Sequence, residues 1–215
     1  MMSAYVSASA LADWRGILSS HGVEPEAISG DDSQPVPLPD FVSALERVAA
    51  SCGQPGLAWT AGQSADYGTR GQVGRVVLGS KTLGLALRRL STYFPLVQDA
   101  TSLKLEVGES WTTLKYKILD PDIWPRHEDA MYSLGIYAFL LKTVAPDGWG
   151  HVELSVEADR DAIRADLSDI VEANVAYGAP TNTLRFPTGL LAPTLRLGRT
   201  GHRARRRQCR AKDRR

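Results

Sequence analysis

The chain has 215 residues, and its 25 Lys and Arg nearly balance its 24 Asp and Glu, which leaves a formal net charge of +1. A hydrophobic share of 43% can build a folded core, so disorder of the whole chain is excluded. No segment approaches the roughly 20 consecutive apolar residues of a membrane helix, and the first residues lack the basic flank of a secretory signal. The two cysteines are too few for a disulfide framework, so we expect a cytoplasmic protein.

The positive charge is concentrated at the C-terminus. Residues 196–215 contain nine Arg, one Lys and one Asp, a net charge of +9, so the other 195 residues together carry −8. This division predicts an acidic folded domain over residues 1–195 and a basic, disordered tail over residues 196–215.

The tail is the one segment whose charge favours nucleic acid. It has too few apolar residues to fold as a helix-turn-helix, so any binding is expected to be weak, non-specific and directed at phosphates. Out-of-frame translation of a GC-rich gene is an alternative explanation of its composition. The candidate nucleic-acid contacts are Arg203, Arg205, Arg206 and Arg207.

Helices are predicted first along the chain. Apolar residues recur at helical spacing over residues 9–20 and again over residues 41–53, where Asp40 is placed to cap the helix. Residues 60–80 are rich in glycine, which is expected to break any long element. A further helix is expected over residues 80–94.

That last helix has Ser80 as its expected N-cap, and Pro95 ends it. The period of the pattern then changes from helical spacing to two. Residues 103–107 and 114–118 alternate apolar with charged side chains on either side of a short turn, which predicts an antiparallel hairpin with one buried face.

The remaining pattern predicts a helix flanked by strands. Residues 126–144 form a long segment that is apolar nearly all round, as expected of a central helix. Strands are expected over residues 152–156 and 183–186, with a helix capped by Asp159 between them. The fold class is therefore α+β, with N-terminal helices followed by an antiparallel sheet packed on a long central helix.

Local catalytic and metal-binding motifs are absent from the sequence. The four histidines show no metal-ligand spacing, and no nucleophile motif is present, so we expect no enzyme, no metal and no cofactor. The run His127-Glu128-Asp129 could supply a metal ligand or a proton-transfer group, but the acidic first turn of a helix is the favoured interpretation. The spaced glycines of residues 68–74 likewise suggest a connector rather than a phosphate-binding loop.

Aromatic side chains gather in the second half of the chain. They could line an apolar pocket between the sheet and the long helix, or they could simply fill the core. The candidate effector-pocket residues are Trp111, Tyr116, Trp124, Tyr132 and Tyr137.

The order of these segments resembles one family, the N-terminal arabinose-binding-type domain of AraC-like bacterial transcription regulators. The resemblance covers roughly residues 10–195. Its motifs are apolar patterns and glycines in a characteristic order, namely residues 37–62, 67–74, 80–94, the hairpin, Trp149 with the strand after it, and the closing segment 177–187.

The resemblance implies an effector-sensing domain that binds a small molecule and forms a homodimer. Members of that family continue into a helix-turn-helix region, whereas this chain has only the basic tail after Leu195. The expected function is thus the regulatory domain of an AraC-type regulator truncated before its DNA-binding region. The alternative is a stand-alone small-molecule-binding protein or an enzyme with an unrecognised site.

Overall fold

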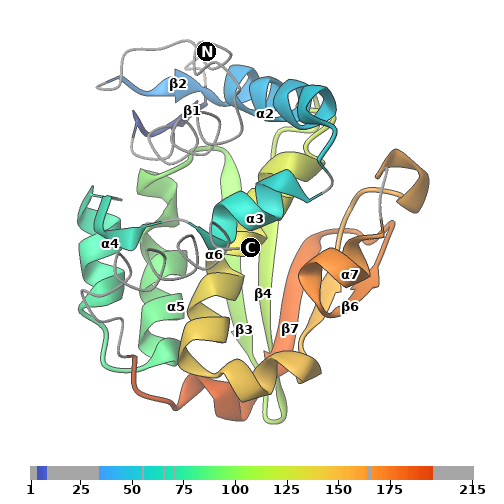
Figure 1. Ribbon diagram of the computed structural model, residues 1–215. Helices are drawn as coiled ribbons and strands as arrows, with labels where there is room; N and C mark the ends of the chain where they lie inside the picture. The colour runs from blue at the N-terminus through green and yellow to red at the C-terminus, as the bar shows by residue number, and fades with distance from the viewer. Residues whose placement is uncertain are drawn as a thin grey trace, which may run out of the picture.

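A computed structural model describes residues 4–8 and 34–195, except residues 55, 65, 70, 164 and 165. Within this part, helices lie against one five-stranded sheet, and the last strands of the chain belong to that sheet (Figure 1). The α+β expectation is confirmed. The expected helix over residues 9–20 and the basic tail lie outside the described residues.

The sheet has the strand order β3-β4-β7-β5-β6, with β3 at Thr101–Val107, β4 at Trp111–Ile118, β7 at Asn182–Pro187, β5 at Glu153–Ser155 and β6 at Asn174–Ala176. The predicted hairpin is β3–β4, and its strands pair antiparallel. All neighbouring pairs are antiparallel except β5–β6, which is parallel. The sequence analysis missed β6, a short strand without a fully buried residue.

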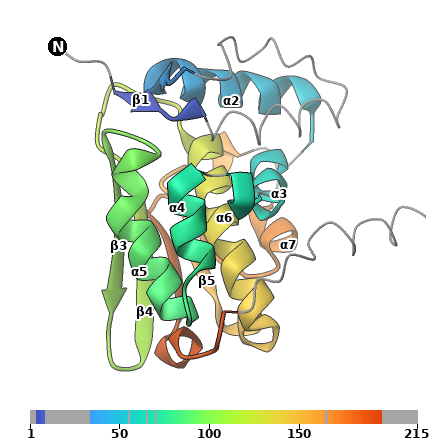
Figure 2. The same ribbon diagram turned by 90° about the vertical axis from the view of Figure 1, so that its left-hand side faces the viewer.

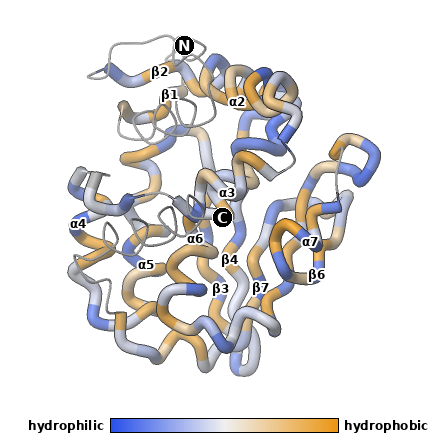
Figure 3. Tube along the Cα trace, in the orientation of Figure 1, coloured by the Kyte–Doolittle hydropathy of each residue, from blue (hydrophilic) through white to orange (hydrophobic). Residues whose placement is uncertain are grey.

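The central helix α6 (His127–Val144) packs against β4 and β7, as its nearly uniform apolar pattern predicts. The helix α5 (Leu83–Tyr93) lies beside it against β3. Hydrophobic residues run along the helices that face the sheet (Figure 3). Because α6 is covered on one side by the sheet and on the other by helices, twelve of its residues are buried.

The remaining helices form an outer layer. The helix α2 (Leu38–Cys52) lies across one end of the molecule and packs on α6, and α4 (Gly71–Leu78) packs on α5 (Figure 2). The short helix α7 (Leu167–Val171) lies beside β6. Near the N-terminus, β1 (Tyr5–Val6) and β2 (Val36–Pro37) pair antiparallel. The 3-10 turns are η2 (Tyr67–Thr69), η3 (Phe94–Leu96), η4 (Pro146–His151), η5 (Arg160–Ala162) and η6 (Thr188–Leu191).

Two predicted helix starts are wrong. The helix α2 begins at Leu38, two residues before the expected cap Asp40, because proline is tolerated in the first turn of a helix, where its missing N–H costs no bond. Asp40 lies in that first turn instead. The cap of α5 is Thr82 rather than Ser80, since its hydroxyl oxygen accepts a hydrogen bond from the Leu85 amide at 3.2 Å.

The helix expected from Asp159 onwards is also wrong. A 3-10 turn follows Asp159, and the α-helix α7 begins only at Leu167. Its cap is Asp166, whose carboxylate accepts a hydrogen bond from the Ser168 amide at 2.9 Å. The expected helix therefore splits in two because the capping carboxylate lies seven residues further along the chain.

The glycine-rich region 60–80 contains short helices, and the connector expected over residues 68–74 is wrong in its second half, because α4 begins at Gly71. It includes the end of α3 (Leu57–Gln63) and all of α4. Gly62 of α3 lies directly on Gly135 of α6, and a Cβ atom added to Gly135 would come within 2.5 Å of the Trp59 carbonyl oxygen. Gly62 and Gly135 allow two helices to pack closely. In the sequence alone, glycines of this kind cannot be told from glycines in turns.

We predict that Gly135→Ala destabilises the protein by about 1–3 kcal/mol, because the added methyl group overpacks the α3–α6 contact. For a chain of this size the melting temperature should fall by roughly 3–10 °C, measured by circular dichroism. Gly150→Ala is the matched control, since no atom lies within 4 Å of the added carbon, and its effect should stay within about 0.5 kcal/mol. Equal melting temperatures for the two variants would contradict the packing argument.

Candidate functional site

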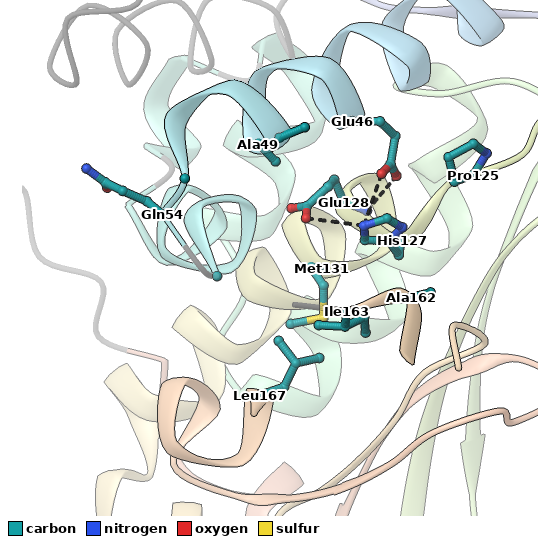
Figure 4. Close-up of a pocket in the computed structure, with 13 residues that line it drawn as sticks. Glu46, Ala49, Gln54, Pro125, His127, Glu128, Met131, Ala162, Ile163 and Leu167 are labelled. Atoms are coloured by element: carbon teal, nitrogen blue, oxygen red, sulfur yellow. Dashed lines mark hydrogen bonds and ion pairs between the residues drawn. The ribbon is translucent and has the colours of Figure 1, made fainter. Parts of the chain in front are cut away.

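A cavity of about 300 Å³ opens between α2, the start of α6 and the segment that leads into α7. Figure 4 shows its walls coming from three parts of the chain that are distant in sequence. The lining residues are Glu46, Ala49, Ala50, Gly53, Gln54, Gly56, Pro125, His127, Glu128, Met131, Ala162, Ile163 and Leu167.

One side of the cavity is apolar. Met131 on α6, Ile163 before α7 and Leu167 at its start lie together at the bottom of the view in Figure 4. Ala49 of α2 lies above them and leaves the space open, because a larger side chain there would fill it. This side suits the hydrocarbon part of a small molecule.

The other side carries three titratable groups that point toward one another (Figure 4). The Glu46 carboxylate extends from α2 and accepts a hydrogen bond from the Glu128 amide at 2.9 Å. Its second oxygen lies 3.1 Å from His127 Nε2, and a Glu128 carboxylate oxygen lies 3.4 Å from the same nitrogen. The imidazole thus lies between two carboxylates, one from each helix.

Burial changes the acidity of these groups. It raises the pKa of Glu46 to about 7, against the opposing effects of His127 and of the bond from the Glu128 amide. Burial alone would lower the pKa of His127, but the hydrogen bond to Glu128 and the negative charges of Glu46 and Glu128 outweigh it, so the pKa lies above 6.5. The cluster therefore favours positive charge at its centre.

A second polar group lies behind the cavity, in the core. Asp129, the next residue of α6, is fully buried, and its carboxylate accepts a hydrogen bond from the Tyr116 hydroxyl of β4. The side-chain amide of Gln98 donates to that same hydroxyl oxygen at 2.8 Å. Burial raises the pKa of Asp129 to about 6, although the Tyr116 hydrogen bond opposes the shift, and raises the pKa of Tyr116 as well.

The residue before the helix, Arg126, joins α6 to the sheet. Its guanidinium makes two contacts of 3.2 Å with the Glu157 carboxylate, which follows β5. It also donates to the backbone carbonyls of Ile118 and Asp120, each at 3.1 Å. This planar, two-bond pairing fixes the direction in which α6 leaves the loop.

The comparisons with known proteins now decide the family. The profile of the arabinose-binding domain of AraC transcription regulators, an N-terminal domain, matches residues 12–195. The chain belongs to this family. The domain is thus a regulatory, ligand-binding domain of the AraC type.

The AraC-type domain also has the fold of a solved structure. It is similar to the transcriptional regulator CdpR from Pseudomonas aeruginosa, with 16% sequence identity and a TM-score of 0.57. The match covers 86% of this chain and 57% of that one, so the chain spans somewhat over half the length of that regulator. The search of curated proteins found no match. Among its described residues, no helix is both long and apolar enough to cross a membrane.

The five aromatic residues predicted for the effector pocket of the AraC-type domain do not line this cavity. Tyr116, Tyr132 and Tyr137 are buried in the core. Trp124 is 59% exposed, and Trp111 is 36% exposed with the Arg185 guanidinium over its ring at 4.1 Å. The four tail arginines lie outside the described residues.

The cavity residues of the AraC-type domain were only partly visible in the sequence. The run His127-Glu128-Asp129 does form the first turn of a helix, as its favoured interpretation holds, yet two of its side chains also face the cavity. Glu46 lies in the middle of an amphipathic helix, where a carboxylate is ordinarily a solvated surface group. No signal in the sequence pairs it with His127, 81 positions later.

We predict that Tyr116→Phe destabilises the AraC-type domain by about 1–3 kcal/mol at pH 8, where Asp129 is ionised and loses its hydroxyl donor. At pH 5, below the Asp129 pKa of about 6, the loss should be smaller because the carboxyl group is protonated. Urea denaturation at the two pH values measures both.

Tyr93→Phe is the matched control, since Tyr93 is exposed and its substitution should change stability by no more than about 0.5 kcal/mol. A Tyr116→Phe variant as stable as the wild type at pH 8 would show that the hydroxyl does not support the buried carboxylate.

Proposed function

We propose that the domain senses a small-molecule effector in the cavity between α2, α6 and α7. The observation that carries this proposal is the combination of an apolar side, formed by Met131, Ile163 and Leu167, with a polar side formed by Glu46, His127 and Glu128. Such a combination fits a small ligand, because apolar surface supplies affinity and a few polar groups fix orientation. The membership in a ligand-binding regulatory family supports the same conclusion.

The chemistry of the lining narrows the class of effector. None of the described residues that line the cavity is Lys or Arg, whereas Glu46 and Glu128 both face it. A strongly anionic effector would meet two carboxylates, and the one basic group among the described lining residues, the His127 imidazole, is already paired with both of them. The cavity therefore favours a neutral or positively charged molecule with an apolar part.

A bound effector would act on the rest of the domain through α6. Its polar groups reach His127 and Glu128 in the first turn of that helix, and the following Asp129 bonds to β4 in the core. The cavity residue Glu128 is therefore the immediate neighbour of Asp129, which makes the buried hydrogen bond with Tyr116. This short path is the physical basis on which ligand binding would alter the domain's interactions.

Self-association is a second part of the proposal. Large apolar side chains are exposed on α5 and on the η3 turn that follows it, namely Leu85, Tyr93 and Leu96. A homodimer is the commonest assembly for a soluble domain, and this surface would be buried in it. Sedimentation velocity at micromolar concentration tests it: a mass of one chain, 23.4 kDa, would contradict the dimer.

A third part of the proposal concerns the basic C-terminal tail. We expect residues 1–195 to fold without residues 196–215, because every described element ends before Leu195. Any nucleic acid held by the basic tail would then be bound through phosphates and with little sequence preference.

We predict that Ala49→Trp abolishes effector binding by filling the cavity. The probes are a panel of small organic cations and uncharged metabolites, scored by thermal shift. A compound present at about 100 times its dissociation constant stabilises the wild type by about 2.7 kcal/mol, a rise of roughly 5–10 °C. The same compounds should leave the melting temperature of Ala49→Trp unchanged.

The matched control is Ala192→Trp, at an exposed alanine outside the cavity lining, which should keep the full shift. Ala50→Trp, at an exposed position that also lines the cavity, should lose it and guards against a folding defect in the first variant. Shifts that persist in both cavity variants, or a panel without any shift in the wild type, would contradict the proposed site.

A further inference from the structure

The three titratable side chains at the polar side of the cavity have the composition of a metal site. Glu46, His127 and Glu128 each offer one ligand atom, and these atoms all lie within 4.8 Å of one another. Two are carboxylate oxygens and one is an imidazole nitrogen. They come from two different helices and converge on one point (Figure 4).

We propose that Glu46, His127 and Glu128 bind a divalent transition-metal ion of the zinc type. The proposal stands whether or not a small molecule binds in the cavity, since an ion at the polar side leaves the apolar side open. The ion would link α2 to the start of α6.

The spacing of the ligand atoms supports this site. In a tetrahedral zinc site with bonds of about 2.1 Å, neighbouring ligand atoms are separated by roughly 3.4 Å. The His127 nitrogen lies 3.1 Å from the Glu46 oxygen and 3.4 Å from the Glu128 oxygen, so both edges nearly have that length. The third edge, between the two carboxylate oxygens, is no longer than 4.8 Å, and rotation of the two Glu side chains would bring it to the tetrahedral length.

The surroundings of the ligands favour coordination as well. The Glu46 oxygen that does not face His127 already accepts a hydrogen bond from the Glu128 amide, and such a bond orients a carboxylate for a metal. The three groups supply up to two negative charges, and no Lys or Arg among the described lining residues competes for them. A bound cation would therefore meet ligands that are already oriented.

The donor set also selects the metal. Imidazole nitrogen with carboxylate oxygen suits zinc, cobalt and nickel, whereas magnesium and calcium prefer sites made of oxygen alone. Three protein ligands leave one tetrahedral position, and the adjoining cavity is where a water molecule or a donor atom of a small molecule would complete the site.

Isothermal titration of the metal-free full chain with zinc chloride tests the proposal. The wild type should bind zinc at this site, and His127→Gln and Glu46→Gln should each weaken that binding at least tenfold. Glu46→Gln keeps a carbonyl oxygen that can accept the Glu128 amide bond, so its fold should persist. The matched control is His151→Gln, at an exposed histidine outside the cavity, which should bind zinc as the wild type does.

A second readout separates this site from any zinc held elsewhere on the chain. Zinc should raise the melting temperature of the wild type and of His151→Gln, and the rise should be lost in His127→Gln and Glu46→Gln. Magnesium at the same concentration should give no rise. Equal zinc affinity and equal thermal shifts in the wild type and both ligand variants would overturn the proposal, as would stabilisation by magnesium that equals that by zinc.

Discussion

Four consecutive residues at the start of α6 bond three different parts of the fold, and the position of the cavity depends on them. Arg126 pairs with Glu157 beside the sheet, His127 and Glu128 meet Glu46 of α2, and Asp129 bonds Tyr116 of β4 in the core. Charged groups in a protein interior are stable only when they are paired in this way. The charged groups that are buried or half-buried around the cavity thus meet at one helix terminus.

The body of α6 is positioned by packing rather than by charge. Gly62 and Gly135 let α3 approach α6 so closely that no side chain fits between their backbones. The opposite face of α6 lies on β4 and β7. Because α6 is held on both faces, its first turn contacts α2 at one place. There the Glu46 carboxylate bonds to it, and the cavity opens beside this contact. Packing along the helix therefore determines the geometry of its charged end.

The sequence predicted those elements whose burial is periodic. The alternating pattern of β3 and β4 predicts strands with one buried face. The continuous apolar run of α6 predicts a helix that is buried nearly all round. The packing role of Gly62 and Gly135 was not predicted, since a glycine in a turn and one in a helix contact look alike in sequence. Glu46 was not predicted as a cavity residue for a similar reason. Its role arises from a tertiary contact with His127, which no local pattern records.

A double-mutant cycle between Glu46→Gln and His127→Gln tests the central claim most directly, namely that α2 and the start of α6 are bonded across the cavity. Unfolding by urea, with a metal chelator present, gives the four free energies. The account predicts a coupling energy of at least about 0.5 kcal/mol, as for residues in contact. A cycle of Glu46→Gln with Glu106→Gln, beside the hairpin turn at the far end of the molecule from α2 (Figure 1), should be additive. Additivity of the Glu46 and His127 substitutions as well would contradict the account.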